Sequence, residues 1–542
     1  MQTLDFDNRF TAQLPADDNP AGTRRQVSNA LYTRVQPTPV RAPYLIATAS
    51  EVADLVGLSP SYLESDEFLA TFAGNEPLPG MDPHATCYGG HQFGNWAGQL
   101  GDGRAINLGE LAGPNGRHML QLKGAGPTPF SRTADGLAVL RSSVREFLCS
   151  EAMHHLGVPT TRALSLIGTG EEVLRDMLYD GNAEMEPGAV VCRVSRSFVR
   201  FGHFQLLTAR GEHELLRQFT DFVLSEYFPD LAPARGAADA ARRDAYLAWF
   251  HHVCTTTAEM IVHWMRVGFV HGVMNTDNMS ILGETIDYGP YGWLEDFDPD
   301  WTPNTTDAGQ RRYRYGQQPA IGQWNLMQLA NAILPLVGEP KPLEEALSAY
   351  ARTYEQAWQA MMAAKLGLNT FDPSTVDGLM VLLTSAETDM TLFFRGLAEV
   401  DPHAPELSQT AEPDERHLAP LLAAHYPDPG ASSASNAARL AQVKQQTAAW
   451  LAVYGKACAE QGVDEAQRGA LMNQVNPLYV LRNYLAQLAI DEAHEGDFGQ
   501  INTLLDVLRR PYEKQPGREA FAEKRPDWAR TRVGGSMLSC SS

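Results

Sequence analysis

The sequence lacks the features that mark several large classes of protein. Its six cysteines include no C-x-x-C pair and no zinc-site spacing, and most lie in apolar surroundings, as reduced core residues of a cytosolic protein do. No stretch approaches the roughly 18 consecutive apolar residues that span a bilayer. Basic residues are also in deficit, with 43 Lys and Arg against 65 Asp and Glu and a net charge of −22. This balance disfavours a general nucleic-acid binder, which needs a basic face.

Residues 1–7 lack the basic and apolar regions of a signal peptide. We therefore expect a cytoplasmic monomer that contacts neither membrane nor nucleic acid. What the chain does have is length and apolar content: 542 residues, 44% of them hydrophobic. Such a chain can build a large core in two or three domains or in one bilobal enzyme.

Strand patterns come first along the chain, and helical patterns follow. Residues 85–130 are glycine-rich and strand-like, residues 139–156 carry the apolar stripe of a helix, and 162–166 and 189–195 are further expected strands. From about residue 213 the pattern turns helical, and the expected helical stretches are 237–268, 319–366 and 440–508. Between the last two, residues 401–415 and 428–436 are expected to form surface loops, since they are rich in Pro, Ser, Asp and Glu.

This order indicates an α+β, protein-kinase-like bilobal fold with a strand-rich N-lobe and a helical C-lobe with extensions, although other α+β folds share the segregation. We expect an N-terminal extension over 1–75, the N-lobe over 76–210, the C-lobe with the catalytic and metal-binding loops over 211–510, and a C-terminal tail over 511–542.

The most informative stretch is 271–278, which reads H-G-V-M-N-T-D-N and is followed, after a short apolar segment, by D-Y-G at 287–289. Kinase-type catalytic loops read H-R-D-x-x-x-x-N or H-G-D-x-x-x-x-N and then D-F-G. His271 and Asn278 match this pattern, but Val273 occupies the position of the catalytic aspartate. A valine side chain cannot accept a proton, so the site is either inactive or performs a reaction other than ordinary phosphorylation.

Two side chains of this stretch are candidate metal ligands. Asn278 and Asp287 offer an amide oxygen and a carboxylate, and magnesium in nucleotide sites takes one or two such protein groups. A turn and a strand over 279–286 are expected to bring the two together. Asp277 is the loop's own carboxylate and a candidate general base. The alternative is an Asx turn at 277–278 and a loop cap at 287.

Several cations and glycines upstream suit a phosphate ligand. Lys123 ends an apolar strand, and Glu146 on the next helix can orient it, with Glu151 as a competitor. The order G-x-x-G-x-G at 98–103 places backbone amides near Arg104. Each of these features also occurs in ordinary turns and on solvated surfaces.

Two arginines and a turn sequence are further candidates for the phosphate site. Arg193 and Arg200 lie seven residues apart among aromatic side chains, and arginine binds phosphate through two parallel hydrogen bonds. Asp135 and Gly136 form a turn sequence that can bring in a second loop. The competing interpretation of the arginines is a pair of surface salt bridges.

Taken together, these segments resemble the selenoprotein O family, called YdiU in bacteria, of protein adenylyltransferases. The resemblance covers most of the chain, and the matching stretches are 88–94, 98–104, 121–126, 131–136, 144–147, 200–204, 271–278, 287–290, 476–477, 482–485 and 526–529. It implies a kinase-like fold that binds ATP flipped relative to kinases. AMP then passes to a Ser, Thr or Tyr hydroxyl of a protein substrate, and diphosphate leaves.

The resemblance also implies a role for each matched residue. Asp277 is the proton acceptor, Asn278 and Asp287 bind Mg²⁺ or Mn²⁺, and Glu146 supports Lys123. The residues that contact the nucleotide are Gly101, Gly103, Arg104, Lys123, Asp135, Gly136, Arg193, Arg200 and Asp287.

Two departures from the family pattern stand out. Leu137 follows Asp135-Gly136 where many relatives have arginine. Pro303 stands where bacterial relatives often carry a cysteine that pairs with one equivalent to Cys540, so a redox role for Cys540 lacks its partner here. Three alternatives stay open: UMP transfer from UTP, a catalytically silent nucleotide-binding pseudokinase, and a small-molecule phosphotransferase.

Overall fold

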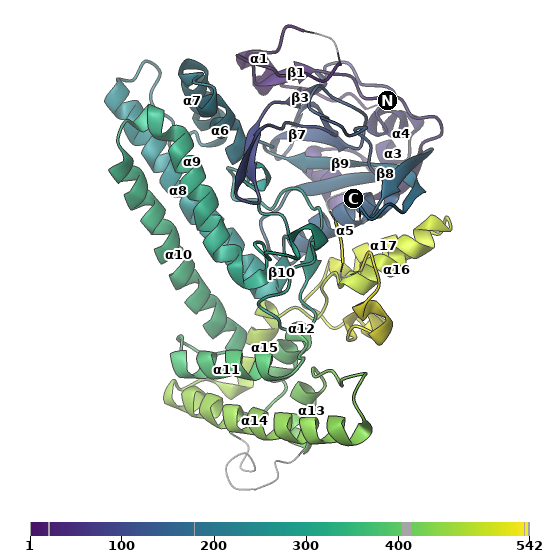
Figure 1. The fold of residues 1–542 in the computed structure, drawn as a ribbon, viewed down its shortest axis with the longest axis vertical. Coiled ribbons are helices and arrows are strands. Elements are labelled where there is room, and N and C mark those ends of the chain that lie inside the picture. Colours follow the sequence, from purple (N-terminus) through teal and green to yellow (C-terminus); the bar gives the residue numbers. More distant parts are fainter. Residues whose placement is uncertain (1, 20–21, 178, 404–414, 536, 540–542) are drawn as a thin grey trace.

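A computed structural model describes residues 2–19, 22–177, 179–403, 415–535 and 537–539 of the chain. The strands lie almost entirely within the first 195 residues, and most of the helices follow (Figure 1). The main sheet is antiparallel. An antiparallel sheet followed by a helical part agrees with the expected α+β class.

Seven strands form the main sheet in the order β1-β3-β6-β7-β9-β8-β2. Their bounds are β1 (Tyr32–Arg34), β2 (Tyr44–Thr48), β3 (His84–Thr86), β6 (Ala105–Gly113), β7 (Gly116–Lys123), β8 (Arg162–Asp176) and β9 (Ala183–Ser195). A separate hairpin consists of β4 (Gly89–Gln92) and β5 (Asn95–Gln99). The predicted strands at 162–166 and 189–195 are confirmed as parts of β8 and β9, which are both longer.

The pairing of β7 with β9 positions side chains for the site. Residues two apart on a strand face the same side, so Gln121 and Lys123 share a face of β7. The register sets Arg193 of β9 directly opposite Gln121. Three polar side chains therefore lie close together on one face of the sheet.

Helix α5 (Leu140–His155) packs against β8 and β9 and confirms the helix predicted at 139–156. Its other side meets α16 (Asn483–His494) and α17 (Gly499–Leu508), so it is covered on nearly every side. That position explains why even Arg145 and Glu146 of this helix are buried. Shorter helices flank the sheet, namely α1 (Arg9–Gln13), α2 (Ser50–Val56), α3 (Pro60–Leu63) and α4 (Asp66–Phe72).

The C-terminal part of the chain is helical, and α8, α9 and α10 run side by side along the left of Figure 1. The helices of this part are α6 (Phe201–Ala209), α7 (His213–Tyr227), α8 (Asp239–Val267), α9 (Gln318–Val337), α10 (Pro340–Leu366), α11 (Pro373–Ser385), α12 (Met390–Leu397), α13 (Glu415–Leu422), α14 (Ser433–Glu460) and α15 (Glu465–Val475). The predicted loop at 428–436 ends early. Ser432 caps α14 by accepting a 3.2 Å hydrogen bond from the backbone of Ser435, so the helix already begins at Ser433.

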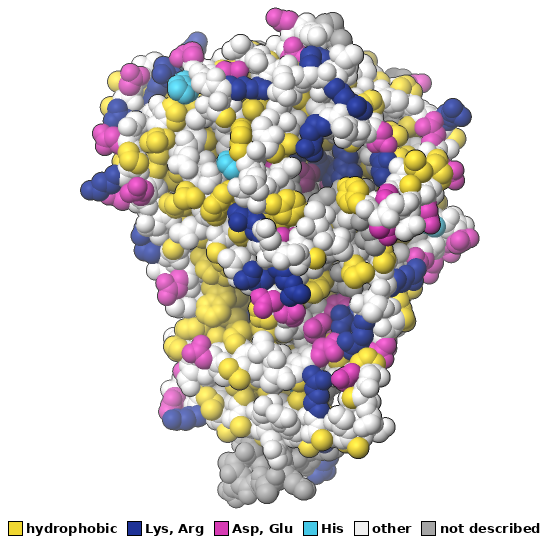
Figure 2. Space-filling model, viewed as in Figure 1, with side chains coloured by type: hydrophobic (Ala, Val, Ile, Leu, Met, Phe, Trp, Pro, Cys, Tyr) yellow, Lys and Arg dark blue, Asp and Glu magenta, His cyan; other side chains and the backbone are white. Residues whose placement is uncertain are grey.

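Helix α8 leads into a short strand, β10 (Phe269–Val270), which pairs with β11 (Gly292–Trp293) and encloses the loop that begins at His271. The strand expected over 279–286 does not form. Ser280 bridges Arg200 and Thr285 bridges Thr160, with a turn between them. Because the two bridges reach two different parts of the chain, no continuous ladder can develop. In the space-filling view, Lys and Arg side chains gather around a hollow in the upper part of the face (Figure 2).

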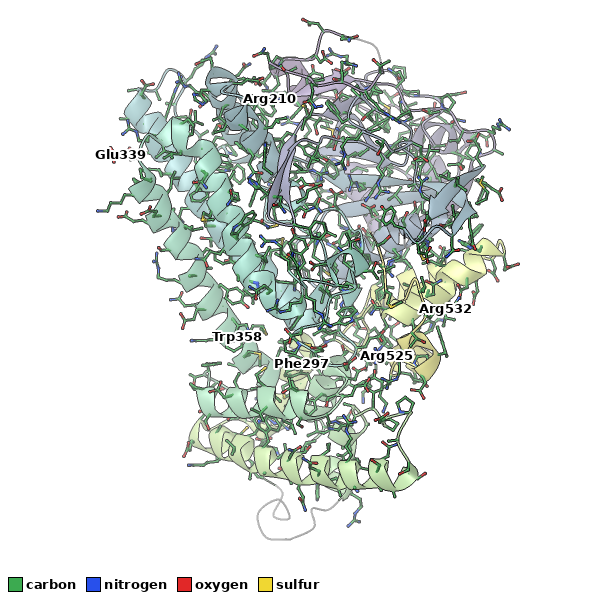
Figure 3. The ribbon with its side chains drawn as sticks, viewed as in Figure 1. Arg210, Phe297, Glu339, Trp358, Arg525 and Arg532 are labelled. Carbon is green, nitrogen blue, oxygen red and sulfur yellow. The ribbon has the colours of Figure 1, made fainter. Side chains whose placement is uncertain are left out.

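The segment after α17 is held to the helical part by charge pairs. Arg525 lies 2.7 Å from Glu387, 3.2 Å from Asp296 and 3.3 Å from Glu295, and it appears near Phe297 at the waist of the molecule (Figure 3). Close by, Arg482 and Asp389 form a fully buried ion pair at 2.7 Å. In the part of the chain that the structure describes, no helix combines the length and apolar character needed to cross a membrane.

Candidate active site

A cavity of about 830 Å³ opens where the sheet, the β4–β5 hairpin and the loop after β10 meet. Ligand-binding pockets usually measure about 300–1,000 Å³, so the volume of this cavity is in the range of a small-molecule site. The predicted site residues on its wall are Gly101, Gly103, Arg104, Lys123, Asp135, Gly136, Arg193, Arg200, Asp277, Asn278 and Asp287. Only Glu146 among the predicted residues is absent from the wall, and it contacts Lys123 from behind.

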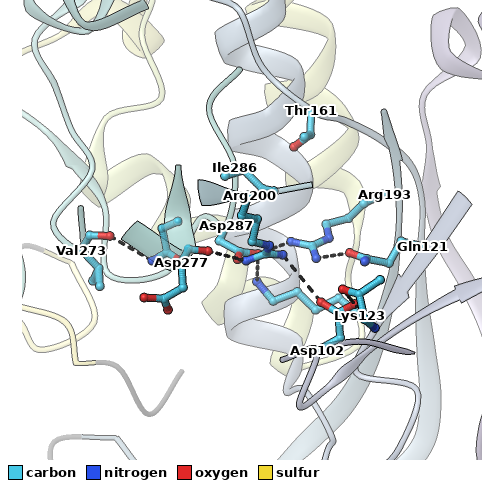
Figure 4. Close-up of polar contacts among 12 residues, drawn as sticks. Asp102, Gln121, Lys123, Thr161, Arg193, Arg200, Val273, Asp277, Ile286 and Asp287 are labelled. Carbon is cyan, nitrogen blue, oxygen red and sulfur yellow. Dashed lines mark hydrogen bonds and ion pairs between the residues drawn. The ribbon is translucent and has the colours of Figure 1, made fainter. Parts of the chain in front are cut away.

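Asp287 is the centre of the charge network in this cavity (Figure 4). Arg193 donates to one carboxylate oxygen and Arg200 to the other, and Lys123 Nζ lies 3.9 Å from Oδ1. Burial alone raises the pKa of a carboxyl, but Arg200, Arg193 and Lys123 hold the pKa of Asp287 well below its ordinary value. Asp287 is therefore a carboxylate at every physiological pH.

The backbone of Asp287 is itself unusual. Its φ of +61° lies in the left-handed region that side chains other than glycine rarely occupy. Such conformations cost about 1–3 kcal/mol and persist where surrounding contacts impose them. The paired arginines supply such contacts, so the carboxylate is fixed on the cavity wall rather than free to turn into solvent.

Lys123 is oriented from the opposite side by Glu146, whose Oε2 lies 2.6 Å from its Nζ. Burial lowers the pKa of Lys123, and Glu146 and Asp287 oppose that effect. The competitor Glu151 is taken by Arg162, at 2.6 Å, and does not reach Lys123. Arg193 also contacts Glu146, at 3.0 Å, so one carboxylate of α5 holds two cations of the sheet.

Asp277 lies in a short 3-10 helix, Thr276–Asn278, with its side chain on the cavity wall. Only 7% of the residue is exposed, and burial raises its pKa to about 6, against the lowering effect of a hydrogen bond from Gln92. Oδ2 accepts that bond at 3.2 Å, whereas Oδ1 has no hydrogen-bond partner among the described residues. A carboxylate with one free oxygen and a pKa near neutrality suits a proton acceptor.

The donor set fits a magnesium-type ion. Asn278 donates its amide nitrogen to the carbonyl of Val273 at 2.9 Å, which leaves its side-chain oxygen as the available ligand. Asn278 and Asp287 line the same cavity, and oxygen ligands of this kind suit Mg²⁺ or Mn²⁺, which take their remaining ligands from phosphate and water. No cluster of three or more His, Cys, Asp or Glu side chains suited to a metal occurs among the described residues.

The glycine segment lines the same cavity as Asp287. Gly101 has a φ of +87°, and a Cβ there would lie 2.6 Å from the ring of Phe130, so only glycine fits. Farther along the rim, Asp135 is paired with Arg175 at 2.7 Å. These segments bring backbone groups and the side chain of Arg104 to the cavity.

Sequence reasoning missed three side chains of this site. Asp102 is buried, accepts from Thr86, and lies 3.8 Å from Arg200. Gln121 accepts from Arg193 across the β7–β9 pairing, and Gln92 reaches Asp277. Asp102 could have been found from the sequence, because it lies between the two predicted site residues Gly101 and Gly103. Gln92 and Gln121 act through contacts with residues far along the chain, which no local pattern reveals.

The end of the described chain pairs with the loop that contains Pro303. Leu538 donates its backbone N–H to the carbonyl of Pro303 at 2.9 Å and accepts from Thr305 at 2.7 Å. Cys540 lies outside the described residues. Pro303 is thus held to the tail by backbone hydrogen bonds.

The chain is similar to one family model and to several relatives that share one name. A family model described as "Protein adenylyltransferase SelO" matches residues 21–509. Proteins named "Protein nucleotidyltransferase YdiU" are similar along their entire length: 58% identical over 546 residues in Azoarcus sp. (strain BH72) and 57% over 550 in Aromatoleum aromaticum, covering 100% of both chains in each case. The relative from Rhodopirellula baltica is 57% identical over 551 residues, covering 99% of both chains.

Proposed function

The chain belongs to the SelO family of protein adenylyltransferases, and from that premise we propose that it transfers AMP from ATP to Ser, Thr or Tyr hydroxyls of proteins. One observation carries the proposal: a single cavity gathers a carboxylate with a free oxygen, an amide and carboxylate suited to a metal, and several cations suited to phosphate. We further propose that its walls are the lobes of a kinase-like fold, 76–210 and 211–510, with 1–75 and 511–542 as extensions.

The cations of the cavity are the groups that would bind the phosphates. Lys123, Arg193 and Arg200 are held by carboxylates, and phosphate oxygens can take the place of those carboxylates because guanidinium groups bind both in the same paired geometry. Asp287 would then be released toward the metal. Asn278 and Asp287 would hold that ion, which supplies charge neutralisation for the phosphates when bound.

Asp277 performs the proton transfer in this proposal. The acceptor hydroxyl oxygen forms a bond to the α-phosphorus, its proton passes to the free Oδ1 of Asp277, and the bond from the α-phosphorus to the bridging oxygen breaks. Diphosphate carries away the electron pair of that bond, and AMP remains on the protein. Val273 then has no proton to accept, and its carbonyl instead positions Asn278.

The proposal is tested with ATP labelled at either the α- or the γ-phosphorus, Mg²⁺ or Mn²⁺, and a mixture of cellular proteins as acceptors. The proposed function predicts protein-bound label from the α-position alone. Label from the γ-position alone would make the protein a kinase, and no label from either would favour a silent nucleotide-binding protein.

The same assay separates the two nucleotides. The relatives' name, nucleotidyltransferase, does not specify a base, so UTP labelled at the α-phosphorus is compared with ATP at equal concentration. Greater transfer from UTP would replace AMP by UMP in the proposal and leave the roles of Asp277 and Asp287 unchanged.

A further inference from the structure

The β4–β5 hairpin lies directly on the loop that carries Asp277. The backbone N–H of His91 donates to Thr276 Oγ1 at 2.7 Å, and that of Phe93 donates to Asn275 Oδ1 at 3.2 Å. Two consecutive side chains before Asp277 are thus fixed by the hairpin backbone. The hairpin and the loop are separated by more than 180 residues in the sequence, so their contact is a product of the tertiary fold.

Gly90 is where the hairpin comes closest to Asp277. A Cβ at residue 90 would collide most closely with Oδ1 of Asp277, and it would lie 2.8 Å from Cβ and 2.9 Å from the carboxyl carbon of that residue, inside the separation that real side chains keep. Gly90 does not have a positive φ, so the requirement for glycine here is one of space and not of backbone conformation. The carboxylate of Asp277 rests against bare backbone.

Gln92 follows two residues later and therefore faces the same side of β4 as Gly90. Its Nε2 donates to Oδ2 of Asp277 at 3.2 Å. The other oxygen, Oδ1, has no hydrogen-bond partner among the described residues, although it is buried. Buried carboxylate oxygens are normally hydrogen-bonded, so an exception needs a reason. Oδ1 therefore retains the capacity to accept a hydrogen bond from a hydroxyl.

We propose that Gln92 is a positioning residue for the acceptor side of the reaction: by holding Oδ2 of Asp277 it fixes the orientation of the carboxylate toward the incoming hydroxyl, and Gly90 leaves beside Oδ1 the space that any other side chain would fill. The inference rests on the proposed function, in which Asp277 accepts the proton of that hydroxyl. Gln92 lines the same cavity, so its amide acts from within the site. It touches the base and none of the predicted phosphate or metal groups, so its effect belongs to the transfer step and not to nucleotide binding.

The test uses Gln92→Met, which keeps the length of the side chain and removes the donor. Single-turnover transfer is measured at saturating nucleotide and acceptor, together with the dissociation constant for ATP and the thermal midpoint. We expect the transfer rate to fall about 10–100-fold, as when an orienting partner is lost, with ATP affinity and midpoint unchanged. Asn95→Ala on the exposed part of the same hairpin is the matched control and should keep the wild-type rate.

A double-mutant cycle tests the role of Gln92 separately from the role of Asp277 as the proton acceptor. If Gln92 acts through Asp277, Gln92→Met has no further effect in an Asp277→Asn background. Full activity of Asp277→Asn alone would overturn the proposed base. A large loss in Asp277→Asn with a wild-type rate in Gln92→Met would overturn only the role of Gln92. Weakened ATP binding or a lowered midpoint in Gln92→Met would make Gln92 a structural brace and also overturn it.

Gly90→Ala provides a second, independent variant. The added methyl must displace the Asp277 carboxylate, so we expect the transfer rate to fall at least as far as in Gln92→Met while ATP still binds. An unchanged rate in Gly90→Ala would contradict the steric argument.

Discussion

Two of the ion networks among the described residues differ in what surrounds them. Asp287, with Arg193 and Arg200, lies on the wall of a large cavity, its side chain is 19% exposed, and its backbone is left-handed. Asp389, with Arg482, is completely buried, caps the start of α12, and borders neither this cavity nor the apolar pocket beside α8 and α10.

The difference separates charges that can exchange partners from charges that cannot. Both oxygens of Asp389 are occupied, by Arg482, by Tyr426 and by the backbone of Leu392, and no ligand can reach them. The arginines at Asp287 face a cavity of about 830 Å³. Buried ion pairs add little net stability, but breaking one is costly. The Asp389 network therefore joins segments of the fold, whereas the Asp287 network is poised for a ligand.

The largest effect is expected for Asp287→Asn. We expect transfer to fall on the order of 1,000-fold, because the amide lacks the charge that the metal requires. The thermal midpoint should fall less than in the Asp389 variant described next, since the side chain of Asp287 is 19% exposed to the cavity whereas that of Asp389 is fully buried. Initial rates with saturating ATP and Mn²⁺ measure the first effect. Activity within about tenfold of wild type would show that Asp287 is not a metal ligand.

The matched variant in the other network is Asp389→Asn. It leaves Arg482 buried beside a neutral partner, and we expect a loss of about 3–5 kcal/mol in the free energy of unfolding. Transfer by the protein that stays folded, measured well below the midpoint, should equal that of wild type. A selective loss of turnover without a loss of stability would erase the distinction between the two networks.

Glu146→Gln tests whether Glu146 of α5 belongs to the ion network around Asp287. Its carboxylate orients both Lys123 and Arg193, so we expect transfer to fall about 10–100-fold, mainly through weaker nucleotide binding. Glu151→Gln on the same helix is the control, because Glu151 pairs with Arg162. It should lower stability and leave ATP affinity intact, and equal effects of the two variants on ATP affinity would refute the assignment.

The smallest expected effect is on pH dependence. Burial raises the pKa of Asp277 to about 6, and the carboxyl must be ionised to accept a proton. Transfer should therefore be maximal well above pH 6 and decline as the pH falls through about 6, reaching half its maximum there. This decline is measured as the transfer rate of the wild-type protein between about pH 5 and pH 8, with folding monitored in parallel. A rate that is flat down to about pH 5 would argue against Asp277 as the base.

Local patterns in the sequence predicted much of this architecture. The helix at α5 followed from its apolar stripe, and the positions of Lys123 and Asp287 followed from strand-end and motif spacing. The segment 279–286 was mispredicted because a short apolar run looks the same whether it pairs with one strand or with two separate segments. Its two single bridges depend on where Arg200 and Thr160 lie in the fold.

The contacts that give the site its character lie beyond any local pattern. Asp287 meets Arg193 and Arg200 across 94 and 87 residues, and Asp389 meets Arg482 across 93. Each acid and each arginine looks alike in the sequence, and only the fold decides which pairs face a cavity. Residues 88–94, which include Gln92, resembled a stretch of the family, but the hairpin that they begin and its contact with Asp277 were not predicted.

The most direct test of the account is the intact mass of a protein acceptor after incubation with the enzyme, unlabelled ATP and Mn²⁺, run side by side for wild type, Asp287→Asn and Asp389→Asn. We predict an added mass equal to one AMP group with wild type and with folded Asp389→Asn, and none with Asp287→Asn. An added mass equal to a phosphate group, or an AMP adduct formed equally well by Asp287→Asn, would contradict the claim that the Asp287 cavity is the site of nucleotide transfer.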